Sequence, residues 1–146
     1  QRGLLTPSGD NYVDYHDCMR WFTDLIEKYK IYPLKVGYDR YSATYFSQEM
    51  EQYGFHMDSV DQGENLYGVI QLTQGELEDG RMRIGDNDIT KAHLLNSAVK
   101  MSTERGRGKL VKLSPNLHID GTAALLDAMT MRSKYLAEIG DQLRNN

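Results

Sequence analysis

The chain has 146 residues, of which 40% are hydrophobic and 26% charged, and its net charge is −4; this length suits about one globular domain. No apolar run approaches the roughly 18 residues needed to cross a bilayer, so we expect no membrane span. Residues 1–8 lack a secretory signal pattern, and the one cysteine, Cys18, excludes an internal disulfide, which makes a reducing, cytoplasmic setting the default expectation.

The first part of the chain predicts a helix followed by a strand. Asp14 is suited to cap a helix whose apolar residues recur at helical spacing as far as Tyr29, and Pro33 is expected to stop it. Residues 34–38 are short and largely apolar, which is typical of a buried strand. Asp39 follows, so a carboxylate is predicted at the carboxyl edge of that strand.

A second helix, a second strand and a third helix are predicted next. Ser42 is a reasonable cap for the second helix, and Gly54 stands where a helix-ending glycine belongs. The expected buried stripe of this helix is Phe46, Met50 and Tyr53. Residues 55–60 predict a strand, and a third helix is expected to end at Gly80. Its apolar stripe is Leu66, Val69, Ile70, Thr73 and Leu77.

The second half begins with weaker patterns. Residues 82–84 are a short strand candidate, and Asp88 is suited to cap a fourth helix. The expected apolar positions of that helix are Ile89, Ala92, Leu95 and Val99. Residues 99–103 and 109–113 flank a glycine-spaced basic segment, which predicts a β-hairpin with a basic tip.

The last helix is expected to begin at Asp120. Because it is rich in small and apolar residues, its first turns are predicted to lie tightly against a sheet, buried nearly all round. Strands that alternate with helices imply an α/β fold with a mainly parallel or mixed sheet flanked by helices. Ligands of such folds gather at the carboxyl ends of the strands.

Charge is polarised along the chain. Residues 1–80 contain 6 basic and 14 acidic side chains, a net −8, and residues 81–146 contain 11 and 7, a net +4. An acidic half beside a basic half suits a metal-dependent enzyme that acts on a polyanion, because carboxylates bind cations while Lys and Arg bind phosphates. Two differently solvated faces explain the same asymmetry, and charge alone leaves both interpretations open.

Two aspartates are distinguished by their setting, Asp39 after an apolar strand and Asp120 at the head of a buried helix. Carboxylates brought together from distant positions can hold Mg²⁺ or Mn²⁺, and two such ions can assist phosphodiester cleavage. A turn residue for Asp39 and a helix cap for Asp120 are the simpler alternatives. The best surface for backbone phosphates is the basic cluster, although a solvated hairpin is also possible. This basic cluster is Lys100, Arg105, Arg107, Lys109 and Lys112.

An ordered set of short motifs resembles the C-terminal nuclease domain of tailed-phage terminase large subunits. These motifs are Val36-Gly37-Tyr38-Asp39-Arg40-Tyr41, Asp61-Gln62-Gly63, Leu95-Asn96, Lys112, and Ile119-Asp120-Gly121 before an alanine-rich helix. The similarity runs from about residue 3 to residue 131. It implies a ribonuclease H-like fold and a two-metal (Mg²⁺ or Mn²⁺) endonuclease that cuts concatemeric viral DNA during packaging. It also implies double-stranded DNA, the terminase small subunit and the portal as partners, in the cytoplasm of an infected bacterial host.

The resemblance also implies roles for single residues. Asp39 resembles the second metal-binding aspartate of the family, Asp120 the third, and Lys112 a basic residue near phosphate, whereas Gln62, Gly63 and Asn96 match positions with structural or DNA-proximal roles. The first metal aspartate of the family lies on an opening strand that these 146 residues do not contain, so we expect a sheet that lacks its first strands and weak or no cleavage by the chain alone. No Gly-x-x-x-x-Gly-Lys-Ser/Thr motif is present, so residues 1–146 are predicted to be one nuclease-like domain of a larger terminase large subunit, without its ATPase domain.

Two further residues are candidates for auxiliary roles. Asp127 lies two helical turns beyond Asp120 on the same face, about 10 Å along the axis, which is too far for both to ligate one ion. A solvated or salt-bridged helix residue is the alternative. His118 is suited to contact metal or phosphate, or is simply a loop residue. For the whole chain, the alternatives to the nuclease are a non-catalytic DNA-binding or assembly module, and another ribonuclease H-like nuclease such as a junction resolvase.

Overall fold

The computed structural model describes residues 6–9, 11–39, 41 and 44–144. The elements, in chain order, are α1 (Tyr15–Tyr29), β1 (Val36–Asp39), α2 (Thr44–Gln52), β2 (Met57–Val60), the 3₁₀ turn η1 (Gly63–Leu66), α3 (Tyr67–Glu78), α4 (Asp88–Leu95), β3 (Ser97–Met101), β4 (Gly108–Lys112) and α5 (Asp120–Arg144). Within these residues, no helix is both long and apolar enough to cross a membrane.

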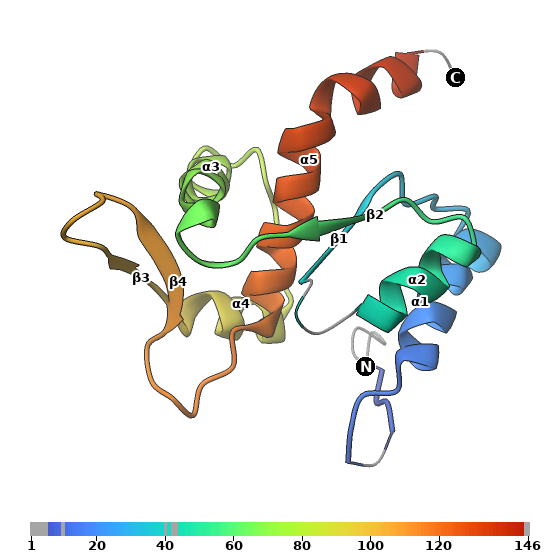
Figure 1. Ribbon diagram of the computed structural model, residues 1–146, viewed down its shortest axis with the longest axis horizontal. Coiled ribbons are helices and arrows are strands. Elements are labelled where there is room, and N and C mark those ends of the chain that lie inside the picture. The colour runs from blue at the N-terminus through green and yellow to red at the C-terminus, as the bar shows by residue number, and fades with distance from the viewer. Residues whose placement is uncertain (1–5, 10, 40, 42–43, 145–146) are drawn as a thin grey trace.

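The strands form two small sheets on either side of α5. β1 and β2 pair in parallel, in register from Val36 opposite Met57 to Asp39 opposite Val60, and β3 and β4 form an antiparallel hairpin. In Figure 1, α5 runs between a group made of β1, β2, α1 and α2 and a group made of α3, α4 and the hairpin. Parallel and antiparallel pairs are both present, as a mixed fold requires, but within the described residues they do not join into one sheet.

Helix α1 begins as predicted and ends earlier than predicted. The Asp14 carboxylate accepts a hydrogen bond from the His16 backbone N–H at 2.9 Å and caps the helix. The helix ends at Lys30, whose φ of 58° is left-handed and whose N–H donates to Ile26 O. Pro33 is therefore not the residue that stops the helix, because the chain has already turned.

Helices α1 and α2 pack together over the start of the parallel pair. The buried residues of this cluster are Met19 of α1, Phe46 and Met50 of α2, and Phe55, which precedes β2. The Phe22 ring packs edge-on against Phe55 at 5.7 Å between centroids, and Cys18 packs against the same cluster, where burial raises the pKa of its thiol. The predicted stripe was wrong at two tyrosines, since Tyr29 and Tyr53 are 67% and 65% exposed. Ser42 lies outside the described residues.

The predictions for residues 82–99 were partly wrong. Residues 82–84 form no strand, and the cap of α4 is Asn87, whose Oδ1 accepts from Ile89 N and Thr90 N at 3.1 Å each. Val99 belongs to β3 and not to the helix, and Leu95 is 77% exposed. The hairpin is confirmed. β3 begins two residues earlier than predicted, and β4 begins one residue earlier.

The second core cluster joins α3 and β2 to α5. Its buried residues are Val60, Leu66, Ile70, Leu126 and Met131. α5 begins at Asp120 as predicted, but its first turns are not buried all round, because Ala124 and Ala128 are exposed. On the opposite side, β1 approaches α5 so closely that a Cβ added to Gly37 would lie 2.8 Å from the Asp127 carbonyl oxygen. Glycine is thus required where the strand crosses the helix.

The C-terminal part of α5 changes direction at Tyr135, whose φ of −112° and ψ of 17° interrupt the helix. The Asp58 carboxylate accepts hydrogen bonds from Lys134 Nζ and Tyr135 Oη, each at 2.5 Å. Burial opposes ionisation of Asp58, but these two bonds hold its pKa below the ordinary value. Lys35 Nζ lies 4.4 Å from the centre of the Tyr135 ring and 3.0 Å from Glu138 Oε1. Both sides of the bend are therefore attached to the parallel pair.

Replacing Gly37 tests the contact between β1 and α5. We expect Gly37→Ala to lower the free energy of unfolding by about 1–3 kcal/mol, because backbone atoms of α5 cannot move aside cheaply. Gly75→Ala is the control: a Cβ there meets nothing within 4 Å, so this substitution inside α3 should stabilise by about 0.5–1 kcal/mol. Urea unfolding measures both. Equal effects of the two substitutions would contradict the close crossing.

Candidate active site

Asp39 is the last residue of β1 and is half-buried. Its Oδ1 accepts a hydrogen bond from the Tyr41 backbone N–H at 3.0 Å, which turns the chain away from the strand. An ionised carboxylate has about four acceptor sites, so this one bond leaves Asp39 with acceptor capacity for a further partner. The role of turn residue and a role in binding are therefore compatible at Asp39.

The direction of β1 relative to α5 brings Asp39 toward the N-terminal part of that helix. Lys35, just before the strand, contacts Glu138, whereas Gly37 lies against Asp127 and Met131. The strand and helix thus run in opposite directions. Two further residues of strand, about 6–7 Å, correspond to roughly four residues of helix, so Asp39 lies on the side of Asp127 that leads toward Asp120.

Asp127 is close enough to Asp39 for the charge of one carboxylate to affect the other. Gln62, which follows β2, donates from Nε2 to Asp127 Oδ1 at 3.1 Å. Burial raises the pKa of Asp127, the bond from Gln62 lowers it, and the negative charge of Asp39 raises it again. Asp127 is therefore not a freely solvated helix residue. Gln62 has a clear role here, because it orients this carboxylate at the end of the parallel strands.

Asp120 occupies the first turn of α5 and not its cap. The first helical bond runs from Ala123 N to Ile119 O at 2.9 Å, so Ile119 holds the cap position. The Asp120 side chain is 80% exposed, and its Oδ2 lies 3.6 Å from Nδ1 of His118, which is 76% exposed. Asp120 thus offers an accessible carboxylate about two helical turns, or roughly 10 Å, from Asp127.

These carboxylates supply oxygen atoms of the kind that Mg²⁺ and Mn²⁺ prefer, but the set is incomplete. Among residues 6–9, 11–39, 41 and 44–144, no three His, Cys, Asp or Glu side chains lie close enough together to hold a metal ion. Carboxylate oxygens are suitable ligands for a divalent cation, but the described residues bring too few of them together to form a metal site.

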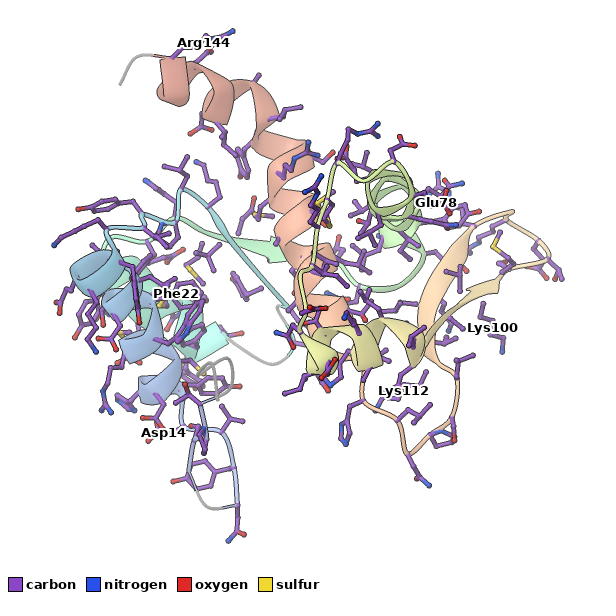
Figure 2. The ribbon with its side chains drawn as sticks, turned by 180° about the vertical axis from the view of Figure 1, so that it is seen from behind. Asp14, Phe22, Glu78, Lys100, Lys112 and Arg144 are labelled. Atoms are coloured by element: carbon purple, nitrogen blue, oxygen red, sulfur yellow. The ribbon has the colours of Figure 1, made fainter. Side chains whose placement is uncertain are left out.

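The basic hairpin divides into two faces. Lys100 of β3 lies directly opposite Lys109 of β4, so the two side chains share one face. Lys112 lies opposite Ser97, on the other face, which is also the face through which Leu110 packs against the core. Figure 2 shows Lys100 and Lys112 well apart on the hairpin. The five predicted basic residues are therefore not one continuous patch.

The tip of the hairpin leans over η1. Arg105, Arg107 and Lys109 line an open hollow together with residues 63–65. Arg105 Nη1 is 3.6 Å from Glu64 Oε2, a long and exposed ion pair that contributes little stability. Two like charges opposite each other at Lys100 and Lys109 are unfavourable in a free hairpin. The arrangement suits an extended anion that neutralises several of these side chains together.

The sequence analysis did not predict the contacts that His93 of α4 and Ser97 of β3 make with the start of α5. His93 Nδ1 accepts a hydrogen bond from Gly121 N at 2.7 Å, and Ser97 Oγ lies 3.0 Å from Thr122 Oγ1. Both pairs are more than twenty residues apart in sequence. Local sequence patterns do not reveal such contacts. The one indication in the sequence is Gly121, because a glycine at a helix start leaves room for a close neighbour.

Comparison with protein-family models and with curated proteins by sequence found no match. Comparison with solved structures found the crystal structure of the HK97 bacteriophage large terminase, with a TM-score of 0.74 and 21% sequence identity over 87% of this chain. The chain spans 26% of the length of that protein. The predicted terminase-like α/β fold is confirmed at the level of the fold.

The raised pKa of Asp127 predicts a pH-dependent effect of Asp127→Asn. A carboxyl with a raised pKa in the folded state contributes stability below its unfolded pKa, and this contribution is lost as the pH rises through the folded pKa. Asp127→Asn should therefore be slightly more stable than the wild type at pH 7, and the difference should vanish near pH ~4, close to the ordinary pKa of Asp. Urea midpoints at pH values between these limits measure it.

Asp58→Asn provides a control of opposite sign. The pKa of Asp58 is lowered, so its ionised form stabilises the fold above the unfolded pKa, and this is lost as the pH falls through the folded pKa. The free energy of unfolding of this variant should be lower than that of the wild type by about 1 kcal/mol at pH 7, because two hydrogen bonds to a partly exposed charge are removed. A destabilised Asp127→Asn at pH 7 would show that its carboxylate is needed in ionised form.

Proposed function

We propose that this chain is the metal-dependent endonuclease part of a phage DNA-packaging terminase. The observation that supports it most is the antiparallel run of β1 against α5, which directs Asp39 along the helix toward Asp120. The terminase-like fold supports the same proposal. Because the chain spans 26% of the HK97 protein, activity and partners of a whole terminase enter only as part of the proposal.

Asp39 and Asp120 are the proposed metal-binding and catalytic carboxylates. Mg²⁺ or Mn²⁺, two ions in the complete site, would polarise the scissile phosphodiester when bound. The chain itself contributes oxygen donors, and Gln62 keeps Asp127 turned toward the end of the parallel strands beside them. Asp127 and His118 are auxiliary in this proposal, Asp127 through its charge beside Asp39 and His118 through its contact with Asp120.

Double-stranded DNA is the proposed substrate, bound through the basic hairpin. Arg105, Arg107 and Lys109 border one hollow, and Lys100 shares a face with Lys109. Lys112 faces the other way, toward the side on which Ser97 contacts α5, so it is the hairpin lysine suited to phosphates near Asp120. Terminase small subunit and portal are the proposed protein partners, in the cytoplasm of an infected bacterial cell.

A second candidate is a non-catalytic DNA-binding or assembly module with the same fold. The observation in its favour is that the described residues bring together no three metal-binding side chains. The two candidates share the hairpin and differ only in hydrolysis. Salt-dependent DNA binding without metal-dependent cleavage would favour the module.

Cleavage of supercoiled plasmid with Mg²⁺ or Mn²⁺ tests the nuclease. Asp39→Asn and Asp120→Asn should each lower the rate at least about a hundredfold, since each removes an anionic oxygen donor, whereas Asp24→Asn on α1 should leave it unchanged. The assay should include the longest polypeptide that contains these 146 residues as well as the chain itself. Undiminished cleavage by both variants would exclude these aspartates from catalysis.

Salt titration of duplex binding tests the hairpin. The double variant Arg107→Ala/Lys109→Ala should bind more weakly, and the slope of log affinity against log salt should fall by about 2, because about one counterion is released per phosphate contact. Arg20→Ala/Lys28→Ala on α1 removes the same charge elsewhere and serves as the control. An identical slope for both double variants would mean that the hairpin does not contact the DNA backbone.

A further inference from the structure

The last turn of α4, Asn96 and the first residue of β3 make hydrogen bonds on both sides of Asp120. Asn96 Nδ2 donates to His118 O at 3.0 Å, before the aspartate. After it, Gly121 N donates to His93 Nδ1 at 2.7 Å, and Thr122 Oγ1 lies 3.0 Å from Ser97 Oγ. We call His93, Asn96 and Ser97 the clamp.

The bond to His93 satisfies a donor that a helix leaves open. The first N–H groups of a helix have no partner within it, and Gly121 N is one of these. Because His93 Nδ1 accepts this bond, the ring carries its proton on Nε2. A Cβ at position 121 would lie 2.9 Å from the same nitrogen, so the close contact depends on the glycine.

The clamp is itself tied together. Ser97 Oγ lies 2.7 Å from His93 O, and since a hydroxyl has one proton, Ser97 donates to that carbonyl and accepts from Thr122, which is only 6% exposed. Leu113 N donates to Asn96 O at 2.9 Å, which attaches the end of the hairpin to the same segment. The hairpin, α4 and the start of α5 therefore meet at one place.

We infer that His93, Asn96 and Ser97 are positioning residues that fix the backbone of Asp120 relative to the basic hairpin. The backbone is held at residues 118 and 121, the Thr122 side chain is held next to them, and the Asp120 side chain stays 80% exposed. An accessible carboxylate on a fixed backbone is what a metal-binding position requires. The functional meaning of this inference rests on the proposed function, whereas the clamp can be tested without it.

Amide hydrogen exchange, resolved by residue with NMR, tests the clamp. In His93→Leu, the Gly121 N–H loses its acceptor, so residues 118–123 should exchange about fivefold to tenfold faster, as expected for one lost hydrogen bond. In His93→Asn, the amide oxygen replaces Nδ1 as acceptor and should restore much of the protection. His56→Leu, which changes an exposed histidine outside the clamp, should leave these amides unchanged.

Three outcomes would overturn the inference. The first is unchanged exchange of residues 118–123 in His93→Leu, and the second is an equal acceleration over the whole chain, which would mean general destabilisation. The third is failure of His93→Asn to restore protection.

Binding of Mn²⁺, followed by paramagnetic broadening of the amide signals around Asp120, separates this inference from the proposed function. We expect His93→Leu to weaken binding severalfold, His93→Asn to restore it, and DNA binding by the hairpin to stay unchanged. Absence of broadening in the longest wild-type polypeptide that contains these 146 residues would contradict the proposed function, and the exchange data would still decide the clamp.

Discussion

The crossing of β1 over α5 is the constraint on which the rest of the arrangement depends. At Gly37 the strand lies on the carbonyl oxygen of Asp127, a contact that any side chain would prevent. This crossing sets the position of Asp39 along the helix. In the register of the parallel pair Asp39 lies opposite Val60, and Gln62, two residues further on, reaches Asp127. The polar end of the sheet is thus a consequence of one close backbone contact.

α5 is attached at both ends to different parts of the chain. Near its C-terminal part, Asp58 of β2 binds Lys134 and Tyr135 at the bend, and near its start the clamp binds Gly121 and Thr122. Between these ends, the helix contacts α3, α4 and both parallel strands. The two small sheets share no strand pairing, so their relative position is set through this helix and through η1, against which β4 packs.

Much of the fold could be predicted from sequence because the signals are local. The Asp14 cap, the strand before Asp39, the hairpin and the start of α5 each depend on neighbouring residues. The end of α1 could not be foreseen, since Lys30 adopts a left-handed conformation that usually indicates glycine. The partners of Asp127 and Gly121 could not be foreseen either, because they come from positions 65 and 28 residues away. The candidate aspartates could therefore be selected from the sequence, whereas the residues that contact them could be identified only from the structure.

The facing lysines of the hairpin, Lys100 and Lys109, make the stability of the hairpin dependent on ionic strength and on bound anions. Their mutual repulsion disfavours the paired register in a dilute buffer, and any polyanion that lies across both removes that strain. Counterions do the same when the ionic strength rises, since the screening length falls to about 8 Å at physiological salt. Added salt therefore weakens the repulsion between the two lysines and, at the same time, their attraction for a polyanion.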